Sequence, residues 1–146
     1  SEGEQKNVIL YCKPANVKVS VVYTEDFLKY YSDCTVSLST SHLTAPFEVN
    51  MKKDSGKDAY LKANADGEKV SITVGGFRDK EGNPVVMDLV AAERVVKPKT
   101  HLTITVDPEV ITISTGTASI DVDVDTSTED KDINIEIPEE YWPGNV

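Results

Sequence analysis

The chain has 146 residues, 39% hydrophobic and 27% charged, which is the usual size of one domain with enough apolar residues to bury a core. Its formal net charge of −10 argues against nucleic acid or an anionic membrane surface as a partner, because phosphate binding needs clustered Lys and Arg. No apolar run is long enough for a transmembrane helix.

The first third of the chain predicts strands and one short helix. Residues 1–6 are polar and are expected to form a loose leader, and the apolar run over 7–12 predicts a strand. Val17, Val19 and Val21 alternate with polar residues, which predicts a strand over 16–23. Thr24 then has the character of a helix N-cap, with acidic residues after it.

The predicted helix is short and aromatic. Phe27, Leu28, Tyr30 and Tyr31 follow one another at helical spacing. We interpret these aromatic residues as a plug over one end of the core, because aromatic side chains are mostly buried. Ligand contact by Tyr30 and Tyr31 is the alternative.

The middle of the chain predicts short strands separated by turns. Alternating or apolar runs predict strands over 34–40, 47–51, 58–63, 69–76, 84–91 and 100–107. Residues 77–84 are expected to form a hairpin loop, and 110–113 a short edge strand. With no long helical pattern between them, these runs predict an all-β, antiparallel, Ig-like β-sandwich with one short helix.

Residues 117–137 carry the clearest pattern and predict a terminal hairpin. The first half, 117–125, alternates apolar residues with Asp, and the second half, 133–137, alternates Ile with polar residues. Six side chains would face the core: Ile120, Val122, Val124, Ile133, Ile135 and Ile137. A stripe of this kind needs a second layer to cover it. Pro138 ends the domain, predicted over 7–138, and 139–146 is expected to be a tail anchored by Tyr141 and Trp142.

The acidic row Asp121, Asp123 and Asp125 raises the question of calcium binding, since calcium takes several carboxylate oxygens. Residues two apart on one strand point in parallel, however, and do not converge as a chelating loop does. We therefore interpret the row as a solvated strand face that discourages aggregation, with calcium as the alternative.

Cys12 and Cys34 are the two cysteines. In an exported protein they could form a disulfide; as free thiols they would be small buried hydrophobic residues. Neither lies at metal-ligand spacing from a His or a second Cys, so we predict no metal site and no cofactor.

The sequence contains no catalytic signature. His42 and His101 lie in different segments, there is no Gly-x-Ser-x-Gly motif, and Gly75-Gly76 leads into Phe77 without a phosphate-binding loop. We therefore predict that the chain is not an enzyme.

Two segments carry a family resemblance. One runs from Leu10 through Cys12, Pro14 and Val21 to Tyr30-Tyr31-Ser32-Asp33; the other is the alternating stretch 118–137 with Thr128-Glu129-Asp130. Together they resemble a Bacteroidetes family of surface lipoprotein domains, fimbrillin-like in organisation and described as domains of unknown function.

The resemblance implies a β-sandwich exported to the cell surface as a lipoprotein and used in adhesion or pilus assembly. The chain is then expected to be a mature or trimmed part of a longer protein, with a preceding β-domain and its signal peptide outside this sequence. Its partner would be a protein or a glycan. A carbohydrate-binding module of a glycan-uptake system is the alternative function, with Tyr141, Trp142, Tyr30 and Tyr31 as candidate ligand contacts.

Overall fold

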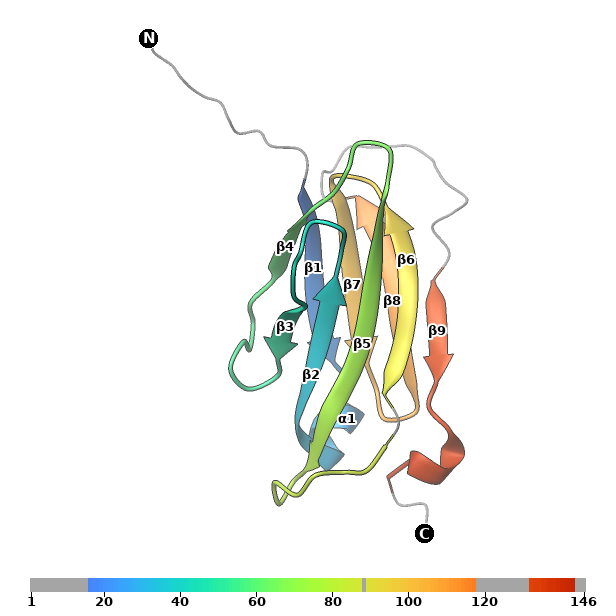
Figure 1. Cartoon of the computed structure of the whole chain (residues 1–146). Coiled ribbons are helices and arrows are strands. Elements are labelled where there is room, and N and C mark those ends of the chain that lie inside the picture. Colours follow the sequence, from blue (N-terminus) through green and yellow to red (C-terminus); the bar gives the residue numbers. More distant parts are fainter. Residues whose placement is uncertain (1–15, 88, 118–131, 144–146) are drawn as a thin grey trace.

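The computed structural model describes residues 16–87, 89–117 and 132–143, which form two packed β-sheets, one short α-helix and the 3-10 helix η2 (Glu139–Tyr141) (Figure 1). The five-stranded sheet has the order β4 (Ala59–Lys62), β1 (Asn16–Tyr23), β7 (Thr100–Val106), β8 (Val110–Thr117) and β9 (Ile133–Glu136). The four-stranded sheet has the order β3 (Phe47–Asn50), β2 (Tyr31–Ser39), β5 (Glu68–Asp79) and β6 (Val90–Val96). The predicted all-β sandwich is confirmed.

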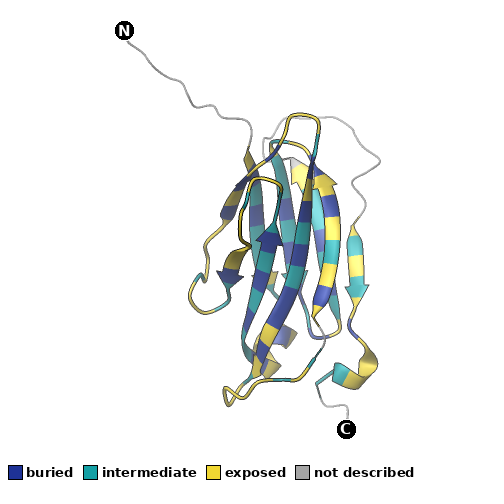
Figure 2. Cartoon of the chain, in the orientation of Figure 1, coloured by how far each residue is buried: buried dark blue, intermediate teal, exposed yellow. Residues whose placement is uncertain are grey.

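The strands form because apolar residues recur at every second position. Figure 2 shows the resulting bands of buried and more exposed residues along β2 and β5. The inward residues of both sheets interdigitate in one core. The largest side chains with almost no exposure are Phe27, Leu38, Ile72, Leu102, Ile104, Ile111 and Ile113.

One strand departs from the antiparallel expectation. β1 pairs with β4 in antiparallel fashion and with β7 in parallel, Lys18 lying opposite Tyr60 on one side and His101 on the other. The other strand pairs between the named strands are antiparallel. β1 therefore brings segments from the start, middle and end of the chain into one sheet.

The aromatic plug is confirmed for Phe27 and Tyr31, which are buried, whereas Leu28 and Tyr30 are 43% and 44% exposed. Helix α1 (Glu25–Tyr30) begins after Thr24, whose Oγ1 accepts a hydrogen bond from the amide of Phe27 at 3.1 Å. The Phe27 ring is fully buried and stacks on Tyr31 with a centroid separation of 4.7 Å. Tyr23 and Phe77 complete the group, so the helix closes one end of the core with aromatic rings.

The prediction that 110–113 is an edge strand is wrong. These residues begin the eight-residue strand β8, which lies between β7 and β9. Ile111 and Ile113 are fully buried and pair across the sheet with Ile135 and Ile133. The sequence predicts the strand but does not reveal that the distant segment 133–136 covers its edge.

The strand expected over 84–91 lies further along the chain. Only an isolated bridge joins Pro84 to Arg78, and the regular strand β6 starts at Val90. Val85 and Met87 pack against the core, whereas Val86 and Leu89 are exposed. Pro84 lacks an amide donor, which is consistent with the late start of regular pairing.

The terminal hairpin is described only in its second half. In β9 the alternation of half-buried Ile133 and Ile135 with exposed Asn134 and Glu136 is as predicted, and Ile137 is buried. β9 pairs with β8, whereas its expected partner over 118–125 lies outside the described residues. The predicted strand over 7–12 and the acidic row 121–125 also lie outside them.

Candidate functional site

Each sheet ends in two edge strands, and β6 is the longest of the four described edges. β6 has seven residues, whereas β3, β4 and β9 have four residues each. Among the described strands, β6 is hydrogen-bonded to β5 alone. An edge strand presents unpaired backbone N–H and C=O groups on its free side, and such groups can pair with another chain.

The outward-facing row of β6 is partly apolar. Leu89, Ala91, Glu93 and Val95 share this row, since the alternate residues Val90, Arg94 and Val96 are buried. Leu89 is 64% exposed and Val95 is 67% exposed. Exposed apolar side chains on an unpaired strand favour contact with a partner. We call residues 89–96 the β6 edge.

Two charged side chains limit how the β6 edge can pair. Arg94 points inward, is 8% exposed, and donates from Nη2 to Thr115 Oγ1 of β8 at 3.2 Å. Glu93 points outward and lies 3.8 Å from the ammonium of Lys69. An inward-pointing charge is one device by which natural sheets restrict indiscriminate edge pairing. The β6 edge therefore combines apolar surface with a feature that opposes aggregation.

The four aromatic residues predicted as ligand contacts have different environments. Tyr31 is 4% exposed in the core, and burial raises the pKa of its hydroxyl. Tyr30 is 44% exposed at the end of α1. Tyr141 and Trp142 are half-buried against the core, and the indole N–H of Trp142 donates to the carbonyl of Ile137 at 2.8 Å. Among the described residues no ring contact joins Tyr30 to Tyr141 or Trp142.

Cys34 is fully buried in β2 and forms no disulfide with a described residue. Burial raises the pKa of its thiol to about 12, and the nearby Tyr23 hydroxyl partly offsets that rise. Burial also raises the pKa of the Tyr23 hydroxyl, and the neighbouring Cys34 adds to that rise. Cys12 lies outside the described residues, so the disulfide stays a prediction.

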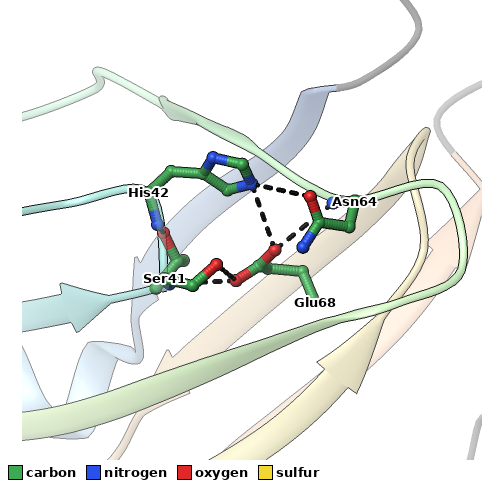
Figure 3. A network of polar contacts seen from close by, with 5 residues as sticks. Ser41, His42, Asn64 and Glu68 are labelled. Carbon is green, nitrogen blue, oxygen red and sulfur yellow. Dashed lines mark hydrogen bonds and ion pairs between the residues drawn. The ribbon is translucent and has the colours of Figure 1, made fainter.

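Glu68 organises a polar network at one end of the sandwich (Figure 3). Glu68 is the first residue of β5, and its charged side chain is buried on the inward face of the sheet. Glu68 Oε2 accepts from the amide and the hydroxyl of Ser41, at 2.9 and 2.7 Å. Glu68 Oε1 accepts from the amide of Asn64 at 3.3 Å. The carboxylate thus ties the loop after β2 to the loop after β4.

His42 covers this network from the solvent side. Its Nε2 lies 3.1 Å from Asn64 Oδ1 and 3.3 Å from Glu68 Oε1. Two acceptors on one nitrogen require that Nε2 carries the proton. Hydrogen bonds from Ser41 are the main cause of the lowered pKa of Glu68, with smaller contributions from Asn64 and His42. We interpret the network as a clamp between two loops.

The second histidine belongs to a separate cluster on the outer face of the five-stranded sheet. Ser20 Oγ lies 2.8 Å from Asp58 Oδ1 and 2.8 Å from His101 Nε2. The single hydroxyl proton goes to Asp58, which can only accept, so His101 Nε2–H donates to Ser20. A serine nucleophile needs the opposite arrangement, with the imidazole as acceptor and the carboxylate bound to the imidazole. This cluster therefore does not build a catalytic triad.

In residues 16–87, 89–117 and 132–143 no group of three or more His, Cys, Asp or Glu side chains is placed to hold a metal ion. No helix in the same residues is long and apolar enough to cross a membrane.

Comparison with known proteins identifies the family. A family model described as "Domain of unknown function (DUF4493)" matches residues 1–139. The chain belongs to the DUF4493 family. No curated protein and no solved structure matches this DUF4493 domain.

The β6 edge of the DUF4493 domain was missed from the sequence. The alternation of Leu89, Ala91, Glu93 and Val95 was available as a signal, but a strand placed over 84–91 divides it. The cluster of Ser20, Asp58 and His101 joins residues up to 81 positions apart, and only the sheet topology brings them together.

Proposed function

We propose that this DUF4493 domain is a non-enzymatic binding module of the Bacteroidetes cell surface, used in adhesion or pilus assembly. Its mechanism would be strand addition, in which an extended segment of a partner protein pairs with β6. The family resemblance to fimbrillin-like surface lipoproteins supports the surface location and export as a lipoprotein. The proposal about mechanism rests on the β6 edge.

The carrying observation is that the longest described edge strand also carries exposed apolar residues. Eight large hydrophobic residues are exposed in the described part of the chain, and two of them, Leu89 and Val95, lie in the β6 edge. Main-chain pairing provides affinity in strand addition, and the alternate side chains provide specificity. Leu89 and Val95 lie at such alternate positions of the outward row.

Carbohydrate binding through Tyr30, Tyr31, Tyr141 and Trp142 is less well supported as a second function. The burial of Tyr31 leaves its ring no surface to offer a sugar. Tyr141 and Trp142 are engaged in packing against the core. Tyr30 is the one ring of the four that is well exposed.

Substitution of Val95 tests the proposed mechanism. Val95→Lys places on the outward row a charged residue of the kind that natural sheets use to block edge pairing. We expect binding to surface-immobilised matrix proteins to weaken by up to about fivefold, because the added strand loses its apolar cross-strand neighbour on the outward row. Surface plasmon resonance on an array of matrix proteins measures this change.

The matched control is Val22→Lys. Val22 is 46% exposed on β1, where it pairs with Thr105 of β7, so the same chemical change there leaves β6 unaltered. Equal weakening by both variants, or binding by neither wild type nor control to any protein of the array, would contradict the proposal.

A further inference from the structure

The outer face of the five-stranded sheet carries a polar and aromatic patch at the β4 end. Tyr60 belongs to β4, and Asp58 is the residue just before that strand. Lys18 and Ser20 belong to β1, and His101 belongs to β7. The strand register places Lys18 between Tyr60 and His101. Asp58 joins the patch through its hydrogen bond to Ser20 and a 3.6 Å ion pair with Lys18. We call these five residues the Tyr60 patch.

Tyr60 is the most exposed aromatic side chain described on this surface. It is 61% exposed, whereas Tyr31 and Phe27 are buried in the core. Tyr60 sits on a four-residue edge strand whose alternate residues Ala59 and Leu61 already anchor it to the core. The ring therefore contributes little to folding and offers a rigid flat surface with a hydroxyl at its tip.

Two groups of the patch, the Nδ1 atom of His101 and the carboxylate of Asp58, keep hydrogen-bonding capacity for a ligand. His101 Nε2–H is used by Ser20, and no described residue bonds its Nδ1. Asp58 holds Ser20 with one oxygen and Lys18 with the other, and each carboxylate oxygen has a further lone pair. Neighbouring side chains thus hold His101 and Asp58 in place before a ligand arrives, which lowers the entropy cost of binding.

Cationic residues gather around the patch, although the whole chain carries a net charge of −10. Lys62 follows Tyr60 on the same face of β4, opposite Asn16 of β1. On the other side of Asn16, the amide of Lys99 donates to the Asn16 carbonyl at 2.8 Å. Lys62 and Lys99 therefore flank Asn16 at one end of the patch, whereas Asp58 lies at the other end of β4, bonded to Ser20 and Lys18.

Two other acidic residues, Asp66 and Glu68, follow β4 in the chain and are engaged or placed away from the lysines beside the patch. Glu68 is buried and bound to Ser41 and Asn64. Asp66 lies in the turn before β5, and the neighbouring Gly67 faces Val95 of the other sheet. Among the described residues beside Tyr60, the three lysines Lys18, Lys62 and Lys99 thus outnumber the one aspartate, Asp58.

Lys99 has an unfavourable backbone conformation. Its φ is 74°, the one positive φ of a non-glycine residue in the described chain. It follows Pro98 in a turn where the amide of Thr100 bonds the carbonyl of Lys97, a position that favours Gly. A residue held in such a strained conformation points to a role for its side chain outside folding.

We infer that the Tyr60 patch binds an acidic polysaccharide. The lysines attract carboxylate or sulfate groups, the Tyr60 ring packs against a sugar ring, and His101 Nδ1 and Asp58 hydrogen-bond to hydroxyl groups. The exposed ring and the hydroxyl-binding groups favour a saccharide over an acidic peptide. This site lies on the opposite sheet from the β6 edge and does not depend on strand addition.

Affinity electrophoresis of the whole chain through gels containing defined polymers tests the inference. Polygalacturonate supplies carboxylates, dextran sulfate supplies sulfates, and plain dextran and polyglutamate are the controls. We expect retardation by polygalacturonate or dextran sulfate, with the stronger of the two identifying the anion. Retardation should fall as salt rises from about 50 to about 500 mM, because salt screens exposed charges. Retardation by neither acidic polysaccharide, or equal retardation by polyglutamate, overturns the inference.

Three variants locate the site. Tyr60→Ala, Lys62→Gln and Lys99→Gly should each weaken binding at least about fivefold, and Lys99→Gly should do so without lowering the thermal midpoint, because Gly suits a positive φ. Lys69→Gln is the matched control, since Lys69 is an exposed lysine on the other sheet. Binding that is unchanged in Tyr60→Ala, or weakened equally by the control, overturns the inference.

Discussion

Glu68 is a carboxylate on the inward face of β5, in a row it shares with Val70 and Ile72. Burying a charged group is unfavourable unless it is paired and hydrogen-bonded. Three hydrogen bonds from Ser41 and Asn64 meet that requirement and fix the two loops that carry them. The carboxylate therefore loses its hydration on folding, and its hydrogen bonds hold the two loops together.

Glu68→Gln should destabilise the fold. The amide nitrogen of Gln cannot accept the hydrogen bonds that one carboxylate oxygen now receives, so we expect a loss of about 1–2 kcal/mol in the free energy of unfolding at pH 7. Glu93→Gln, on an exposed side chain, should change it by less than about 0.5 kcal/mol. Urea denaturation of the two variants provides the comparison, and equal stabilities would show that the network is not a clamp.

The stabilisation by Glu68 should depend on pH. Its pKa is lowered in the folded state, so its contribution is fully present above the ordinary Glu value of about 4.3 and is lost as the pH falls through the lower folded value. The difference between wild type and Glu68→Gln should therefore narrow in acid below that range. A difference that stays constant down to the acid transition would contradict the assigned cause.

Cys34 should be unreactive in the folded protein. The thiolate is the reactive form, and burial raises the pKa of this thiol to about 12. We expect Ellman's reagent to label Cys34 only after unfolding. In denaturant without reductant, two reactive thiols would indicate that Cys12 and Cys34 are free, and none would indicate the predicted disulfide. Labelling of Cys34 under native conditions would contradict its burial.

Helix α1 contributes to the fold mainly through one buried aromatic ring, that of Phe27. The helix has six residues, too few to be stable alone, and only Phe27 is buried in it. Phe27 stacks on Tyr31 and Tyr23 and meets Phe77 edge-on. The helix is therefore held in place by its contribution to the core.

Phe27→Ala should remove about 3–5 kcal/mol of stability, because it leaves a cavity among stacked rings. Leu28→Ala is the matched control on the same helix, since Leu28 is 43% exposed, and it should cost less than about 1 kcal/mol. Thermal and urea unfolding give both values. Similar losses for the two variants would mean that the helix, and not the ring, stabilises this end of the sandwich.

Sequence patterns predict what is local. The period-two alternation of β1, β2 and β7, the Thr24 cap and the aromatic plug could all be predicted, since each depends on neighbouring residues. The pairing of β8 with β9 and of β1 with β7 could not, because it depends on which distant strand covers which edge. The β6 edge and the Tyr60 patch depend on that topology, which is why the sequence alone points to other residues.

For the molecule as a whole, the two sheets have different external surfaces. The four-stranded sheet ends in the seven-residue edge β6, where apolar side chains are exposed. The five-stranded sheet carries the Tyr60 patch, with Lys62 and Lys99 beside it, on its outer face near β4, at the other end of its strand order from β9. A module arranged in this way offers two independent surfaces, one for a protein strand and one for a charged polymer.

Hydrogen–deuterium exchange with and without the best-binding matrix protein tests strand addition most directly. Half of the amides of an edge strand point to the open side and exchange freely until another strand pairs with them. We predict that binding slows exchange in Val90–Val96 and that Val95→Lys reduces this protection at partner concentrations near the wild-type Kd. Slowed exchange confined to β3, β4 or β9, with Val90–Val96 unchanged, would contradict the proposal.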